Sequence, residues 1–211
     1  MTRNQSLDQK IARLIGYLGS LEGPKGRAKL AELRRSATDP LNDYRSIWVL
    51  DDKLPDGKGW QFDAFRIVAS FYALHKQKFS ESPLPAFKKG TYRKSFGASL
   101  RMLRDRLTVG EESMDQRFAA LLDTPKEDLV TPLRNFIQRI ANSDKRIEVD
   151  YNQLLRDLIY WDAHDSILDP KAEPVQRKWA RHYWQPNLQI DTENVDSNSD
   201  NEPKSTDHEN N

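Results

Sequence analysis

Residues 60–75 read WQFDAFRIVASFYALH, and they form the most apolar helical stretch of the chain. Phe65, Val68, Ala69 and Tyr72 recur at the three- and four-residue spacing that places side chains on one helical face. Two further apolar residues beside that face widen it, so most of the helix should be buried. This stretch therefore predicts a buried α-helix rather than a strand.

The same helical period continues on both sides of this stretch. Apolar residues repeat at helical spacing in 7–18, in 91–107 and in 114–122, and only 146–149 offers a short strand candidate. The sequence therefore predicts an all-α fold of about eight helices, packed as a helical bundle or as two linked bundles.

Helix starts are marked by capping residues and by prolines at first helical positions. Such signals occur at Asp39-Pro40, in the capping box 124–127, at Asp150 with Gln153, and at Glu173-Pro174. The helix after Pro40 should bury four side chains, which are Leu41, Tyr44, Ile47 and Trp48. Pro132 predicts a kink, or a new helix start with Thr131 as its cap, because an interior proline costs about 3 kcal/mol.

Charge divides the chain into a basic body and an acidic tail. The 211 residues carry a formal net charge of +1, yet residues 190–211 hold seven acids against Lys204. Residues 1–189 are therefore net +7, with 32 basic and 25 acidic side chains. We expect 1–189 to form the helical domain, with possible sub-lobes 1–107 and 108–189. The tail 190–211 should be disordered, because it has too little apolar surface to offset chain ordering.

Several functional classes lack their motifs. The chain has no cysteine, which excludes disulfides and thiol nucleophiles, and the polar segment 1–10 is not the start of a secretory signal. We found no nucleotide-binding glycine loop, serine-nucleophile elbow or zinc-protease motif. We therefore expect a cytoplasmic protein with no cofactor, no metal and no membrane partner.

One cluster offers an alternative as a metal or nuclease site. Asp157, Asp162, His164 and Asp165 lie near the end of one expected helix. Such sites need more ligands than this cluster supplies, and carboxylates at a helix end are ordinary solvated surface. We expect His75 and His182 to be structural.

Basic residues gather in two segments that favour nucleic-acid binding. Residues 84–106 are net +6 and residues 24–35 are net +4. Cationic stripes neutralise phosphates and release counterions, which gives affinity that does not depend on base sequence. The candidate binding residues are Arg34, Arg35, Lys88, Lys89, Arg93, Lys94, Arg101, Arg104 and Arg117.

The order of several sequence blocks resembles CasB, the small-subunit family of the type I-E CRISPR surveillance complex Cascade. The resemblance covers roughly residues 7–185. Its main blocks are Phe65–His75, Ser95–Leu100, Gln116–Leu122, Val149–Leu158 and Trp179–Trp184.

The resemblance implies a non-enzymatic, all-helical subunit of an antiviral complex that binds RNA and DNA. Two copies would join the other Cascade subunits, CRISPR RNA and target DNA, and would stabilise the R-loop with its displaced strand. The family's paired arginines match Arg34 and Arg35, its basic helix matches Arg101, and a further arginine matches Arg117. Two alternatives stay open: a helical protein–protein adaptor that does not touch nucleic acid, and a metal-dependent nuclease.

Overall fold

The computed structural model describes residues 6–76, 95–107, 109–144, 146–162 and 173–185. This part of the chain contains nine α-helices and no strand, which confirms the all-α prediction, with one helix more than expected. The helices are α1 Leu7–Ser20, α2 Arg27–Ser36, α3 Arg45–Leu50, α4 Trp60–Lys76, α5 Phe96–Arg104, α6 Glu111–Leu122, α7 Val130–Ala141, α8 Tyr151–Ile159 and α9 Val175–Trp184.

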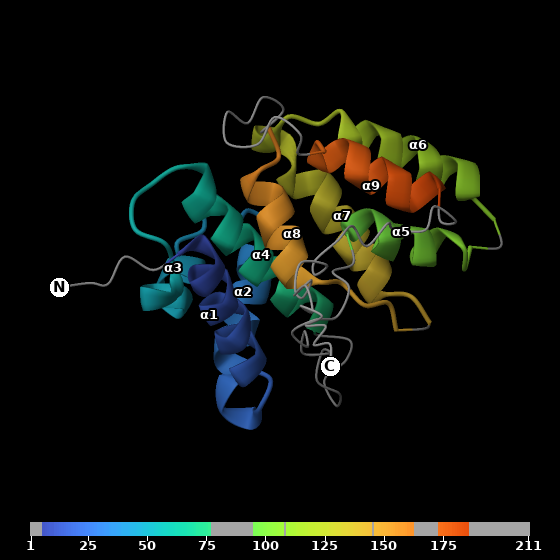
Figure 1. The fold of residues 1–211 in the computed structure, drawn as a ribbon. Helices are drawn as coiled ribbons and strands as arrows, with labels where there is room; N and C mark the ends of the chain where they lie inside the picture. Colours follow the sequence, from blue (N-terminus) through green and yellow to red (C-terminus); the bar gives the residue numbers. More distant parts are fainter. Residues whose placement is uncertain (1–5, 77–94, 108, 145, 163–172, 186–211) are drawn as a thin grey trace, which may run out of the picture.

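Helix α4 occupies the middle of the fold, as its apolar sequence requires. It packs against α2, α7 and α8, and every residue from Ala64 to Ala73 is buried. Burial of each large apolar side chain stabilises the fold by about 1.5–3 kcal/mol, so α4 makes a large contribution to the core. Figure 1 shows α4 and α8 in the middle, with α1 to α3 on one side and α5, α6, α7 and α9 on the other.

Helices α5 and α9 pack closely because one glycine lies between them. A Cβ atom built on Gly97 would lie 2.2 Å from the carbonyl oxygen of Trp179, closer than real Cβ atoms approach. The hydrogen side chain of Gly97 therefore permits this helix crossing. The rings of Phe96 and Trp179 lie 5.2 Å apart beside it.

Two expected helix starts agree with the structure. The Asp150 side chain accepts a hydrogen bond from the backbone nitrogen of Gln153 at 2.9 Å and caps α8. Helix α9 follows directly after Pro174. Pro132 is the third residue of α7, where its missing N–H would have no intrahelical acceptor, so the structure contains a new helix start rather than a kink.

Other local predictions are wrong. Thr124 does not cap a helix; its hydroxyl donates to the Ala120 carbonyl, and the next segment is the 3₁₀ turn Lys126–Asp128. The cap of α7 is Leu129, not Thr131. Residues 146–149 do not form a strand.

The helix expected to begin at Asp39-Pro40 begins only at Arg45, as α3, and its buried face also differs from the prediction. Ser46, Val49 and Leu50 are buried, whereas Tyr44 and Trp48 are 76% and 70% exposed. The buried Ser46 hydroxyl accepts a hydrogen bond from Arg66 of α4. With Ser46 facing Arg66 in the core, the two aromatic side chains lie on the outward side of α3.

No helix in the described segments is long and apolar enough to cross a membrane. The predicted tail 190–211 lies outside the described residues.

Candidate nucleic-acid interface

One side of α2 carries three arginines. Leu30 and Leu33 are buried, Arg27 and Arg35 are exposed, and Arg34, about 40° from Leu30 around the helix, is half-buried. We call the three arginines the α2 basic face. The two exposed arginines, Arg27 and Arg35, present positive charge to solvent on α2.

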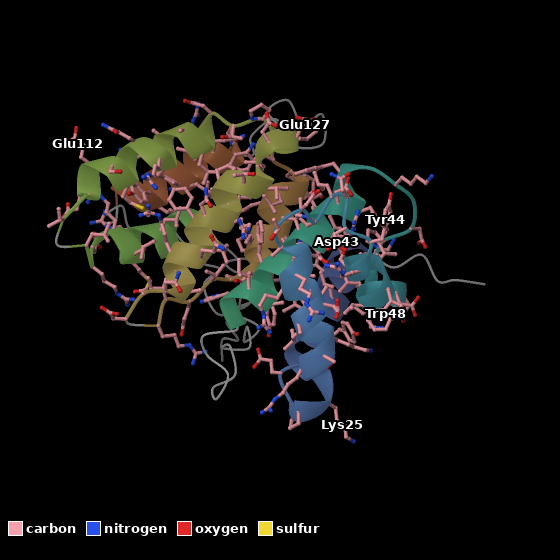
Figure 2. The ribbon with its side chains drawn as sticks, turned by 180° about the vertical axis from the view of Figure 1, so that it is seen from behind. Lys25, Asp43, Tyr44, Trp48, Glu112 and Glu127 are labelled. Carbon is pink, nitrogen blue, oxygen red and sulfur yellow. The ribbon has the colours of Figure 1, made fainter. Side chains whose placement is uncertain are left out.

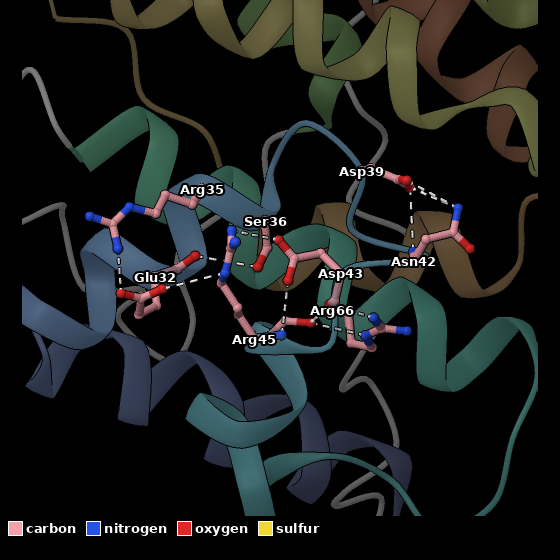
Figure 3. A network of polar contacts seen from close by, with 9 residues as sticks. Glu32, Arg35, Ser36, Asp39, Asn42, Asp43, Arg45 and Arg66 are labelled. Carbon is pink, nitrogen blue, oxygen red and sulfur yellow. Dashed lines mark hydrogen bonds and ion pairs between the residues drawn. The ribbon is translucent and has the colours of Figure 1, made fainter.

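A single carboxylate on α2 holds two guanidinium groups. Glu32 forms an ion pair with Arg35 and a second one, at 3.8 Å, with Arg45 of α3 (Figure 3). The Glu32 side chain is 28% exposed, whereas those of Arg35 and Arg45 are 64% and 54% exposed. The acid therefore lies beneath the two cations, and the positive groups face solvent.

Arg34 carries an N–H group without a partner. Its Nε atom is buried by neighbouring atoms and has no hydrogen-bond partner in the described part of the chain. A buried donor that stays unpaired costs about 1–3 kcal/mol. Because this Nε atom is shielded from solvent, a ligand at α2 would meet the other atoms of the Arg34 side chain.

Arg101 has partners within the fold. Its guanidinium donates to the Tyr183 carbonyl at 3.0 Å and to the Asp105 carboxylate at 3.2 Å. Tyr183 is in the last turn of α9, where carbonyl groups have no intrahelical partner. Arg101 therefore caps α9 and joins it to α5.

Arg104 also has an internal partner. It donates two hydrogen bonds to Asp115 of α6, at 2.6 and 3.0 Å, and this pairing raises the pKa of Arg104 and lowers the pKa of Asp115. The Tyr183 hydroxyl donates to the same carboxylate at 2.7 Å; burial and this bond raise the pKa of Tyr183. Arg104 thus joins α5, α6 and α9.

The remaining candidates differ from these two arginines. Arg117 lies on the exposed side of α6 and forms no hydrogen bond or ion pair with the described residues. The other four candidates are outside the described residues; they are Lys88, Lys89, Arg93 and Lys94. The structure therefore does not place α2, α5 and α6 arginines in one contiguous cluster of free cations.

The carboxylates of the alternative metal hypothesis have protein partners. Asp157 is 3% exposed, and it accepts hydrogen bonds from Lys178 at 2.8 Å, Gln153 at 2.7 Å and Trp179 at 2.6 Å. Asp162 forms an ion pair with Lys126 at 2.9 Å. His164 and Asp165 lie outside the described residues, and the described part of the chain contains no group of three potential metal ligands.

The two internal histidines join helices through hydroxyl groups. His75 Nδ1 lies 2.9 Å from the buried hydroxyl of Tyr151, and His182 Nδ1 lies 2.7 Å from the hydroxyl of Ser95. Burial, followed by the nearby positive charge of Arg181, lowers the pKa of His182. Both contacts are structural, in agreement with the expectation.

Two arginines of this region, Arg27 and Arg45, were not among the residues predicted from the sequence. Arg27 shares a face with Arg34 because seven residues are nearly two helical turns, and this spacing could have been recognised. Arg45 belongs with Arg35 only through Glu32, a tertiary contact that has no local sequence signal.

Comparison with known proteins identifies one family. The family model of CRISPR-associated protein Cse2 matches residues 29–184. No curated protein matches the chain.

Solved structures of the same family share the fold. The crystal structure of CasB from M. ruber is 30% identical, aligns over 86% of this chain and 94% of its own, and gives a TM-score of 0.59. CasB from Thermus thermophilus is 26% identical over 85% of this chain and 99% of its own, with a TM-score of 0.58. A second crystal structure of a Cse2-family protein from Thermus thermophilus, at 24% identity, aligns over 82% of this chain and 97% of its own with a TM-score of 0.60 and shows the fold alone.

Proposed function

The chain belongs to the Cse2, or CasB, family of CRISPR-associated proteins, which are subunits of Cascade, and we propose that it binds nucleic acid there without catalysing a reaction. It holds the R-loop formed by guide RNA and target DNA, together with the displaced strand, during antiviral defence in the cytoplasm. Its partners are the other Cascade subunits, a second copy of itself, CRISPR RNA and target DNA.

The α2 basic face is the observation that carries this proposal. Arg27 and Arg35 are exposed, the half-buried Arg34 adds a third positive charge, and Glu32, the only acid of α2, lies beneath Arg35. Phosphate oxygens match guanidinium groups in charge and in hydrogen-bond geometry.

The energetics of R-loop formation suit such a surface. The RNA–DNA duplex formed is about as stable as the DNA duplex that it replaces, so modest contacts with the backbone tip the balance. Base pairing supplies sequence recognition, and the protein needs only positive charge along the strand.

Arg117 is a second point of contact in this proposal, because its guanidinium is exposed and unpaired among the described residues. Arg101 and Arg104 contribute positive potential while they join α5 to α9 and α6. For this reason, variants of Arg101 and Arg104 would change packing as well as charge.

Salt titration tests the proposal with charge-matched variants. Affinity for a single-stranded oligonucleotide would be measured by fluorescence anisotropy for the wild type, Arg34→Gln, Arg35→Gln and the control Arg177→Gln. Arg177 is an exposed residue of α9, away from α2 in Figure 1.

Each α2 variant should lower the slope of log affinity against log salt by about 0.7, the value for one lost contact with a single strand. The control should keep the wild-type slope. Equal slopes for all four proteins, or wild-type binding that does not depend on salt, would contradict the proposal and favour the adaptor alternative.

A further inference from the structure

Two aromatic side chains on α3 are unusually exposed. Tyr44 is 76% exposed and Trp48 is 70% exposed, whereas most large apolar residues of the described chain are buried. Figure 2 shows both on the outer side of the α1–α3 half of the molecule. An exposed aromatic pair of this kind indicates a binding surface.

Their spacing places the two rings on the same side of the helix. Tyr44 is the N-cap residue of α3, and Trp48 follows four residues later, about one helical turn along the axis. Arg45 lies about 60° from Trp48 around the helix, on the side of Val49, and its side chain is 54% exposed. The outward surface of α3 therefore combines two rings with one guanidinium group.

The surface is held rigidly from beneath. Arg66, only 3% exposed, donates to the Ser46 hydroxyl at 3.0 Å and to the Asp43 carbonyl at 2.8 Å (Figure 3). At the other end of α3, the Tyr17 hydroxyl donates to the Val49 carbonyl at 2.9 Å. Both ends of α3 are therefore anchored, so a ligand would have to order only the exposed side chains of the helix and not its backbone.

Charge favours an anionic occupant. Arg45 pairs with Asp43 at 3.1 Å, and the carboxylate is 20% exposed against 54% for the arginine. Glu32 lies beneath Arg35 and Arg45 in the same way, so in each of these ion pairs the guanidinium group is more exposed than the carboxylate. Through Glu32 this surface is continuous with the α2 basic face.

We propose that Tyr44 and Trp48 stack bases of a single-stranded nucleic acid, whose phosphates Arg35 and Arg45 neutralise. The proposal rests on the proposed function and deepens it, because it names the form of the ligand and the residues that distinguish it. Every base has an aromatic face, so stacking adds affinity without selecting sequence. A duplex keeps its bases stacked on one another and offers none to these rings.

The test compares ligands that differ only in their available bases. Affinities of the wild type, Trp48→Ala and Trp48→Phe would be measured for a single strand, an abasic strand of equal length and a duplex. Tyr160→Ala is the control, since Tyr160 is 49% exposed and lies at the end of α8. Thermal unfolding of each variant would verify that it is folded.

Trp48→Ala should weaken single-strand binding about 5- to 100-fold, which corresponds to the loss of one stacked base. Its affinities for the abasic strand and the duplex should not change, and its salt slope should stay that of the wild type because no phosphate contact is lost. Trp48→Phe should retain most of the affinity, and Tyr160→Ala should retain all of it.

Two results would overturn the inference. The first is equal loss for all three ligands with Trp48→Ala; the slopes of the α2 variants would still decide the proposed function separately. The second is unchanged single-strand affinity with Trp48→Ala. If self-association or assembly into the complex is lost at the same time, this surface is a protein interface.

Discussion

Replacement of Gly97 by alanine should destabilise the protein, although alanine is the better helix former. Gly97 is the second residue of α5, and an added Cβ would lie 2.2 Å from the carbonyl oxygen and 2.9 Å from the Cα of Trp179. These are backbone atoms, so no side-chain rotation relieves the overlap. Helix α9 would have to move away from α5.

The size of the destabilisation by Gly97→Ala follows from contributions of opposite sign. Alanine gains up to about 1 kcal/mol over glycine in helix preference, whereas overpacking of a tight contact costs about 1–3 kcal/mol. Separation of the helices would also weaken the hydrogen bond between Ser95 and His182, which adds about 0.5–1.5 kcal/mol. We expect a net loss of about 1–3 kcal/mol, or roughly 3–10 °C in Tm for a chain of this length.

Gly16 provides the matched control. It lies on the exposed side of α1, and a Cβ at this position would meet no atom within 4 Å. Gly16→Ala should therefore raise the free energy of unfolding by up to about 1 kcal/mol. Both variants would be compared with the wild type by thermal and urea unfolding. Equal stabilisation by the two substitutions would refute the close crossing of α5 and α9.

Three further outcomes follow from the polar contacts. Asp157→Ala should lower the free energy of unfolding in urea by about 3 kcal/mol, because Lys178 and the buried Trp179 lose their acceptor; a loss below about 1 kcal/mol would contradict this. The pKa of His182 is lowered in the folded state, so the unfolded state binds the proton first as pH falls below about 6.5, and stability should decline there. Urea unfolding between about pH 5 and 7.5 should show a smaller decline for His182→Gln than for the wild type, and parallel profiles would exclude this contribution. Arg104→Gln and Asp115→Asn should give a coupling free energy of about 1 kcal/mol in a double-mutant cycle, whereas additive effects would mean that the pair is not formed.

Local patterns were sufficient to predict most helices of this protein. The apolar spacing in 60–75 predicted α4, and the pair Asp150 and Gln153 predicted the start of α8, because helical periodicity and capping involve residues only three or four positions apart. The same reasoning identified the basic character of α2. Its helical wheel depends only on neighbouring residues.

The partners of the charged and aromatic side chains were decided by tertiary contacts. Arg101 and Tyr183 are 82 positions apart, and Ser46 is buried because it meets Arg66, 20 positions away. Such contacts determine which arginines remain available to a phosphate and which face of α3 carries Tyr44 and Trp48 outward. A sequence pattern predicts that a helix is amphipathic. Only the packed neighbours decide whether a polar group on that helix is solvated or forms hydrogen bonds within the fold.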